Sequence, residues 1–430
     1  MKKLFISMGL AAVGTASLQA QYAPGLDSMQ TTKIWSASTT LRGFYDDNYT
    51  TSPNGDKQGS AGYEVSPSLQ LNIPLQQTEI GLKYTYGLYY YQERRNQGND
   101  PYDQSHQVDL WLDHAFTERV QATVKDTLAI GQEPSLLNPG GGPVSEPYRV
   151  NGNNLANNAN ASLTTDWTHE LSTVTTYNNG IYDFQNDDGT ATDPSLAGLL
   201  NRIQQSIGND LQWAVTPETI ALVGYTFQWT LYTAGEPIAP ATISHPTTYY
   251  SNDNNNRSHI LYAGFQQSFL PNLNFSAKVG AQDTTYYNNS QTPDQLTPWA
   301  NVTASYTYAP GSYVQLGFQH LQIASDISTV GSNGNITQGE QASLFTASIN
   351  HQITAKLTGS LIGTVQDSRY YQGAYNNNSD LLYSLGANLT YAFNQHFSTE
   401  LGYNFDDLQS NIPSTGYSRN RVYLGVTAAY

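Results

Sequence analysis

Acidic and basic side chains recur at alternate positions along several segments of this chain. On the wall of a water-filled passage, such groups attract or repel ions and hydrogen-bond polar solutes, which predicts selection without covalent chemistry. They could equally hydrogen-bond one another, or a loop folded between them, and stiffen the wall. The candidates for a wall that faces water are Glu64, Glu79, Lys83, Asp109, Asp113, Lys125, Asp166, Arg202, Asp210, Lys278 and Glu400.

Two tryptophans, Trp111 and Trp299, share the alternating positions of these charges. A flat indole can stack on the face of a sugar, so a carbohydrate path is one hypothesis. The alternative is that both rings pack against an inserted loop.

These residues lie in segments where apolar and polar side chains alternate. Such alternation indicates strands with one apolar and one polar face. It is clearest from Tyr63 to Leu75 and from Glu79 to Leu88, and polar residues blur it from Asn158 to Val215. It recurs in the segments Leu273 to Ala281, Leu296 to Tyr308, Ser343 to Ile353, Leu381 to Phe393 and Phe397 to Phe405.

Short turns and long polar loops alternate between these segments. The short turns are Gln76 to Thr78, Thr117 to Arg119, Thr168 to Glu170, Thr216 to Glu218, Leu270 to Asn272, Ala309 to Gly311, Thr354 to Lys356 and Asn394 to His396. The long loops include Asp46 to Gly62, Gln92 to Ser105, Glu133 to Leu155, Gln185 to Leu200, Thr233 to Arg257 and Ala324 to Glu340. Transmembrane barrels have this asymmetry, with short periplasmic turns and long extracellular loops.

We therefore expect an all-β protein, a transmembrane antiparallel up-and-down β-barrel of about 18 strands, with 16 as the alternative. An even count places both termini in the periplasm. A secreted soluble β-sandwich or β-helix is the main alternative fold. A β-helix would show a fixed short repeat, and a sandwich seldom alternates turn and loop lengths so regularly.

Aromatic residues give an independent check, because barrels carry aromatic girdles at both membrane interfaces. Those expected near the turn end are Trp35, Phe116, Trp167, Trp213, Phe269, Phe275, Tyr308, Phe393, Phe397 and Tyr430. Those expected near the loop end are Tyr45, Tyr90, Trp229, Phe318 and Phe405.

The start of the chain has the layout of a cleaved secretory signal peptide. Lys2 and Lys3 precede an apolar run and then small residues up to Ala20. We expect a signal peptide over 1–20, a short periplasmic segment over 21–32 and a barrel over 33–430 in the bacterial outer membrane. A cut after Ser17 is the alternative site, and an uncleaved anchor is disfavoured because the apolar run is too short to span a bilayer.

The last strand also predicts a barrel, because it alternates up to a terminal aromatic residue. A closed barrel needs this strand intact to leave no edge exposed to lipid. Its end resembles the signal that the bacterial barrel-assembly machinery reads. We expect this machinery to be a partner of the chain. The residues of this signal are Tyr423, Gly425, Ala428 and Tyr430.

Composition excludes several classes of protein. The 430 residues include no Cys, so disulfides do not stabilise the exported chain. The net charge is -16 and becomes 16 minus 34, or -18, without the two lysines of the signal peptide. Such an acidic chain is a poor ligand for nucleic acid. The mean hydropathy of -0.47 would suggest a soluble protein, but barrel strands cancel their own hydropathy signal.

Catalysis finds little support, and we expect neither an enzyme nor a cofactor. None of the eight His residues lies in a nucleophile motif. His106, with Asp103 and Asp109, loosely resembles the acid and His groups of outer-membrane proteases, but spacing alone cannot seat a water between them. The loops Asn186 to Asp193 and Asn252 to Asn256 offer oxygen ligands for Ca²⁺, although solvated loops have the same composition without a metal.

Several short motifs resemble the β-barrel porin-2 family of bacterial outer membranes. They are Gly43-Phe44-Tyr45-Asp46-Asp47-Asn48-Tyr49, Glu64-Val65-Ser66-Pro67-Ser68, and Lys125-Asp126-Thr127 leading to Gln132-Glu133-Pro134. The resemblance implies an outer-membrane barrel, tied in some relatives to exopolysaccharide secretion, with no established catalytic residues. Asp126 falls on the lipid-facing positions in mid-strand, so we expect either a bulge that turns it inward or a place near the interface.

These observations favour a porin-like channel for passive diffusion of small hydrophilic solutes. One alternative is an accessory barrel in exopolysaccharide export, and another is a plugged structural or adhesive barrel. The expected surroundings are outer-membrane lipid and lipopolysaccharide, with glycans as a further hypothesis for a partner. Nothing in the sequence marks a subunit interface, so the oligomeric state stays open.

Overall fold

A computed structural model describes residues 34–137, 141–150, 152–187, 189–241, 243, 246–289, 293–413 and 415–430. The predicted signal peptide, the segment 21–32 and the expected first barrel residue, Lys33, lie outside these residues. No helix in the described part of the chain is long and apolar enough to cross a membrane.

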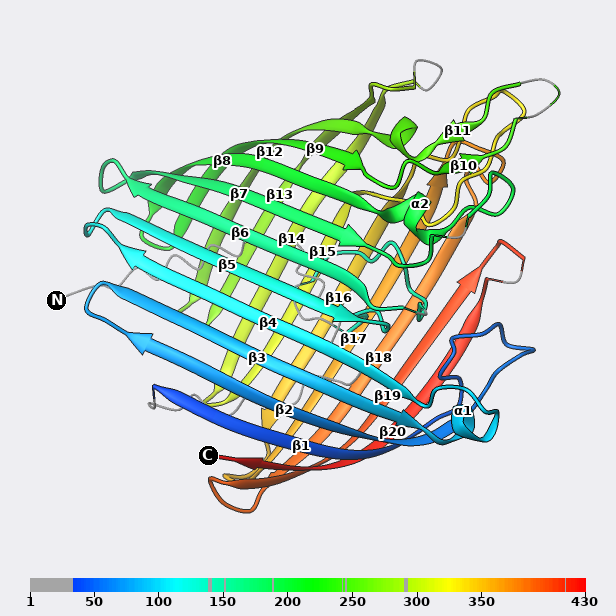
Figure 1. The fold of residues 1–430 in the computed structure, drawn as a ribbon. Coiled ribbons are helices and arrows are strands. Elements are labelled where there is room, and N and C mark those ends of the chain that lie inside the picture. The colour runs from blue at the N-terminus through cyan, green and yellow to red at the C-terminus, as the bar shows by residue number, and fades with distance from the viewer. Residues whose placement is uncertain are drawn as a thin grey trace.

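Eighteen antiparallel strands form one sheet, in which β1 pairs with both β2 and β20 and thereby closes the barrel (Figure 1). The strands are β1 (Trp35–Asp46), β2 (Ser60–Pro74), β3 (Thr78–Tyr91), β4 (Tyr102–Ala115), β5 (Val120–Gly131), β6 (Asn154–Asp166), β7 (Leu171–Asp183), β8 (Arg202–Thr216), β9 (Thr219–Tyr232), β12 (Asn256–Leu270), β13 (Leu273–Tyr286), β14 (Gln295–Ala309), β15 (Ser312–Ile323), β16 (Gly339–Gln352), β17 (Leu357–Tyr371), β18 (Ser379–Ala392), β19 (Phe397–Ser410) and β20 (Tyr417–Ala429). The predicted fold and the count of 18 are confirmed, and the alternatives of 16 strands or a soluble β-protein are wrong.

The loops carry the remaining elements. These are α1 (Gln92–Asn96), α2 (Leu196–Leu200), the 3-10 turn η1 (Ser251–Asn254) and the small sheet of β10 (Pro237–Ala239) and β11 (Tyr249–Tyr250). Side chains from three loops, among them Leu200, Ile238 and Ile336, pack into one buried cluster above the barrel wall. The loop end of the barrel is therefore partly roofed, whereas the turn end is trimmed (Figure 1).

The eight short turns lie where the sequence predicts them, and in four of them the side chain of the first residue explains the shape. The hydroxyls of Thr117, Thr168 and Thr354 each accept hydrogen bonds from the backbone N–H groups two and three residues on, at 3.2 and 3.0 Å. The Asn394 carboxamide does the same at 2.8 and 3.0 Å. A side-chain acceptor that satisfies these N–H groups favours the tight turn over continued strand.

The two faces of the wall have opposite chemistry. The outer face exposes apolar side chains such as Leu41 and Leu424, which are 56% and 60% exposed, whereas the inner face buries Glu64 and Arg421, each 2% exposed. This arrangement is inside out compared with a soluble protein. It suits a wall between hydrocarbon and a polar lumen, in which every backbone group is satisfied by a neighbouring strand.

The aromatic residues expected at the two interfaces are mostly exposed on the outer face. Residues of the turn-end girdle such as Phe116, Trp167 and Trp213 are 59%, 60% and 55% exposed. Tyr430, the terminal aromatic residue, lies 5.1 Å from Trp35 between ring centroids, so the first and last strands of the wall meet in this girdle.

The blurred segment from Asn158 to Val215 still forms three strands in unbroken register over most of their length. Apolar and polar residues alternate poorly here, and the inner face instead carries carboxamides that bond to one another across the strands. Asn160 donates to Asn178 at 2.5 Å, and Asn178 donates to Ser206 at 3.0 Å. Cross-strand hydrogen bonds of this kind stabilise a sheet without apolar patterning.

Candidate functional site

The described residues of the loop between β5 and β6, 132–137, 141–150, 152 and 153, lie inside the barrel and contact its far wall. The loop contacts β17, which lies nearly opposite β5, since seven strands separate the two on one side of the ring and nine on the other. Leu137 packs on the inner-face residue Ile362, and the two side chains are 2% and 3% exposed. We call this segment the constriction loop.

Backbone groups of the constriction loop hydrogen-bond the far wall. Gln366 of β17 donates to the Val144 carbonyl at 2.7 Å and accepts from the Val144 N–H at 2.8 Å. Gln319 of β15 donates to the Gly141 carbonyl at 3.2 Å. A loop without regular structure cannot satisfy its own backbone, so these wall amides fix its path.

Packing reinforces these hydrogen bonds on the side of β18 to β20. Tyr417 donates its hydroxyl to the Pro147 carbonyl at 2.6 Å, and its ring lies 5.9 Å from that of Tyr148. Leu136 and Val144 pack against the same buried cluster. The loop is thus held by apolar contacts as well as by polar ones.

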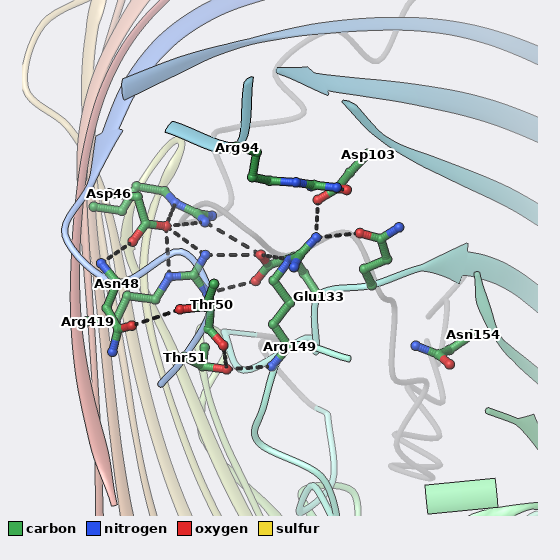
Figure 2. A network of polar contacts seen from close by, with 12 residues as sticks. Asp46, Asn48, Thr50, Thr51, Arg94, Asp103, Glu133, Arg149, Asn154 and Arg419 are labelled. Atoms are coloured by element: carbon green, nitrogen blue, oxygen red, sulfur yellow. Dashed lines mark hydrogen bonds and ion pairs between the residues drawn. The ribbon is translucent and has the colours of Figure 1, made fainter. Parts of the chain in front are cut away.

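A buried network of ion pairs anchors the two ends of the loop to the seam between β1 and β20 (Figure 2). Arg419 donates to Asp46 at 2.9 Å and to Glu133 at 2.7 Å. Arg149 pairs with Glu133 at 3.4 Å and with Asp103. Each charge has opposite charges beside it, which offsets the cost of removing it from water.

Neighbouring residues complete this network, which we call the anchor network. Arg421 donates to Asp46 at 2.9 Å, and Arg94 donates to Asp103 at 2.5 Å. The backbone N–H of Arg149 donates to the Thr51 hydroxyl at 2.9 Å (Figure 2). Residues from the first strands, the last strand and the constriction loop therefore meet in one place.

A group of acids lies on the other side of the loop. Asp326, Glu340 and Asp380 line a cavity of about 20 Å³ beside Val144 and Ser145, which has room for about one water. Burial, together with the nearby Asp380, raises the pKa of Asp326 to about 7. Burial and the nearby Asp326 also raise the pKa of Glu146 well above its usual value. Protons on these acids would remove the repulsion between them.

The structure brings several predicted inner-face charges together. Arg42 donates to Glu64 at 3.0 Å and pairs with Glu400. Across the barrel in strand order, Lys278 pairs with Asp210 at 2.6 Å. Each of these candidates lies on the lumen side, and their mutual pairing favours a structural role within a polar wall.

Other predicted inner-face residues hold local contacts. Asp109 accepts from Gln107 at 2.8 Å and from Thr127 at 3.0 Å, and Asp113 accepts from Thr123 at 2.6 Å. Arg202 donates to the Leu200 carbonyl at 2.9 Å, and its guanidinium lies 4.1 Å from the ring centroid of Tyr182. The register places the remaining candidates on the same face, with Glu79, Lys125 and Asp166 exposed and Lys83 half-buried.

Both predicted tryptophans pack against the wall. Trp111 lies over Gly81, where a Cβ atom would come within 1.7 Å of the indole. Trp299 stacks on Tyr262 at 4.8 Å between ring centroids. Each ring thus contacts a neighbouring strand of the wall, and one face of each ring is covered by that contact.

The structure corrects the expectation for Asp126, and it separates His106 from the acid that would be its partner in the disfavoured protease-like reading. β5 pairs with β4 and β6 without any register shift, so no bulge turns Asp126 inward, and the residue stays on the outer face. Asn157 donates to it at 2.7 Å. His106 points outward and contacts Tyr84 at 2.9 Å, whereas Asp103 lies inside, so the two cannot share a proteolytic site. No group of three metal-ligating side chains is found among the described residues.

The residues at the C-terminus serve closure of the wall. Tyr423 is buried on the inner face, 2% exposed, beside Phe44 of β1. A Cβ atom at Gly425 would come within 2.8 Å of Glu400 and 2.9 Å of Arg42. Glycine at this position therefore makes room for the Arg42 pairs, while Ala428 and Tyr430 face outward.

Residues 335–430 match the family model described as "Putative beta-barrel porin 2". This confirms the resemblance over the last strands, although the motifs that first suggested it lie elsewhere in the chain. Together with the closed 18-stranded wall, it makes the chain a porin-like outer-membrane β-barrel. No protein with a curated description matches it significantly in sequence.

Solved outer-membrane barrels are similar in overall size. OccAB4 of Acinetobacter baumannii is 11% identical, with 93% of this chain and 99% of that chain covered at a TM-score of 0.44. OccK2 (OpdF) of Pseudomonas aeruginosa, solved with glucuronate, is 12% identical, with 92% and 98% covered at 0.44. OpdK of Pseudomonas aeruginosa is 8% identical, with 92% and 99% covered at 0.42. The fold class stands on this chain's own strand pairing.

Sequence reasoning missed the anchor network and the identity of the constriction loop. In the sequence, Asp46 and Glu133 stand out only as members of the family-like motifs and Asp103 only beside His106, and no pattern marks Arg149 or Arg419. One signal was present. Glu133 and Arg149 stand near the two ends of one of the longest loops, in a chain with only 18 basic residues.

Proposed function

We propose that the protein is an outer-membrane channel for passive diffusion of small hydrophilic solutes, and that the constriction loop sets the size of its passage. The observation that carries this proposal is that Leu137 and Val144 of this loop, which leaves the barrel wall at β5, contact β17 on the far wall. A barrel this wide can hold a water-filled path. A loop held inside such a path narrows the passage but leaves it open.

The inner face suits solutes that keep their water. It carries amides, hydroxyls and charges of both signs, many of them already paired, such as Lys278 with Asp210. Paired charges give a polar surface that wets easily but binds no single ion tightly, which favours diffusion over capture. Acids exceed bases by seven to four among the predicted inner-face charges, and Arg42 adds a fifth base, so we expect a weak preference for cations.

The experiment is single-channel recording with the purified barrel in planar bilayers. The chain has no Cys, so Ser145→Cys in the constriction loop can be modified alone with a charged methanethiosulfonate reagent. We expect stable open steps that shrink on modification. Glu118→Cys, in an exposed periplasmic turn, is the matched control and should keep its conductance.

Three results would contradict the proposal. Equal conductance of modified and unmodified Ser145→Cys would remove the constriction loop from the passage. A silent protein that binds glycans would favour the polysaccharide-export alternative instead. A silent protein that binds nothing would leave a structural barrel.

A further inference from the structure

Polar side chains gather on the outer face of β5 to β8, where a membrane protein should present hydrocarbon. We call them the outer polar patch, and its members are Asp126, Asn157, Thr175, Asn179, Gln205 and Asn209. The channel proposed above uses none of them.

Strand register places these residues on the outer face. Thr175 and Asn179 lie two positions on either side of Tyr177, which is 39% exposed and pairs with Ile207, 49% exposed. Gln205 and Asn209 lie two positions on either side of Ile207. Since side chains two apart share a face of a strand, these four residues point away from the lumen.

Hydrogen bonds within the patch run along the surface and join neighbouring strands. Asn157 donates to Asp126 at 2.7 Å, Gln205 donates to Asn179 at 3.0 Å, and Asn209 donates to Thr175 at 2.7 Å. Each amide carries two donor hydrogens and an acceptor oxygen. Asn157 makes a second bond, to the Thr127 carbonyl at 3.4 Å, but these few bonds still leave amide capacity that a hydrocarbon environment cannot satisfy.

The depth of the patch makes lipid a poor neighbour. Asp126 and Asn209 stand near the middle of β5 and β8. Charged residues on the lipid face cost most at the bilayer midplane and least at the interfaces. On the opposite wall the outer face at mid-strand is apolar, with Phe345 and Leu385 at 46% and 38% exposed.

We propose that the outer polar patch is the contact surface for a second copy of this chain. Amides and hydroxyls both donate and accept, so like patches complement one another. The single carboxylate, Asp126, accepts from Asn157 and stands on β5 at the edge of the patch, so a two-fold contact centred on the amides of β7 and β8 keeps the two carboxylates apart. Ala159 and Ala161 on the same face leave room for the walls to approach closely.

A groove on the outer surface continues the patch toward the loop end. It encloses about 520 Å³ and is lined by residues that include Tyr102, Ile130, Leu155 and Asp183. Ile130 and Leu155 are cross-strand neighbours on the outer face. They lie two residues along β5 and β6 from the neighbouring pair Leu128 and Asn157. A protruding side chain from the second copy can fill this groove, which extends the contact beyond the patch itself.

The first test uses cross-linking, which the Cys-free chain allows without background. Asn209→Cys is placed in the patch and Leu361→Cys on the opposite outer face as the matched control. In reconstituted membranes, a short bifunctional thiol reagent should join Asn209→Cys into dimers or closed oligomers and leave Leu361→Cys monomeric. Equal yields from the two positions, or cross-links to another protein only, would overturn the proposal.

The second test replaces polar groups by apolar ones of similar size, in the variant Asn179→Leu with Asn209→Leu. If a second copy covers the patch, native mass spectrometry from mild detergent should show that the wild-type oligomer dissociates in this variant. If lipid covers the patch, the wild type is already monomeric and the variant barrel unfolds at a higher temperature. A monomeric wild type would refute the proposed contact between two copies, and it would do so whether or not the barrel conducts ions.

Discussion

Inside this barrel, buried carboxylates of the anchor network occur beside guanidinium groups. Glu133 accepts from Arg419 at 2.7 Å and lies 3.4 Å from Arg149. Removing one partner of a buried pair leaves the other charge desolvated, which costs more than the pair contributes as a whole. The pairs therefore fix where the constriction loop lies, rather than adding much net stability.

Glu133→Gln should destabilise the folded barrel by about 3 to 5 kcal/mol, because it leaves Arg419 and Arg149 short of negative charge. The check is urea unfolding in detergent, followed by the gel shift between folded and unfolded forms. Glu118→Gln, in an exposed turn, should unfold like the wild type. Identical midpoints for Glu133→Gln and wild type would show that the network does not bear on stability.

Gly81→Ala should displace the indole of Trp111, since a Cβ atom there would overlap the ring at 1.7 Å. The fluorescence of Trp111, taken as the part of the emission that Trp111→Phe removes, should shift to the red. The conductance should fall, because the ring moves into the lumen. Gly43→Ala is the control, because no atom lies within 4 Å of its Cβ position. An unchanged spectrum for Gly81→Ala would mean that the wall yields instead of the ring.

The strands and turns of this protein could be predicted from local sequence patterns, because the side-chain period of two determines which residues lie on each face of a strand. The inner-face candidates Glu64, Glu400, Asp210 and Lys278 follow from that parity alone. Their partners could not be predicted, because Arg42 and Glu400 are far apart in sequence and parity carries no information on register around a ring. The path of the constriction loop was equally out of reach, since its contacts on β17 depend on closure.

The constriction loop should be held more tightly at acidic than at alkaline pH. Because the pKa of Asp326 is about 7, above its ordinary 3.8, the folded state keeps a proton that the unfolded state loses. The stabilisation from this proton is complete below about pH 4 and is lost as the pH rises through about 7. Glu340, Asp380 and Tyr370 line the same cavity. Glu146 lies between its lining residues Ser145 and Pro147, and its own raised pKa acts in the same direction as that of Asp326.

Hydrogen exchange of residues 144–148, corrected for the intrinsic pH dependence, measures this effect. Protection should be greater at pH 5 than at pH 8, and Asp326→Asn should reduce this difference without abolishing it, because Glu146 keeps its own raised pKa. Equal protection of the wild type at both values would rule out Asp326 as the cause. Asp407→Asn, on the outer face of β19, should behave like the wild type.

For the whole molecule, the excess of acids on the inner face predicts weak cation selectivity. A reversal potential measured across a salt gradient should show a few-fold preference for potassium over chloride. Replacing the paired positions Glu79 and Asp113 by Gln and Asn should move the potential toward zero. A preference for chloride in the wild type would show that other charges control the passage.

The seam between β1 and β20 determines when the passage acquires its narrow point. The anchor network joins Asp46 near the start of the chain, Glu133 in the constriction loop and Arg419 near the end. An assembling chain therefore cannot seat its loop until the final strand has arrived, and an unfinished barrel carries neither the wall nor the restriction. Closure of the barrel and restriction of solute size therefore occur together. A barrel that lets large solutes pass is one in which β20 has not paired with β1.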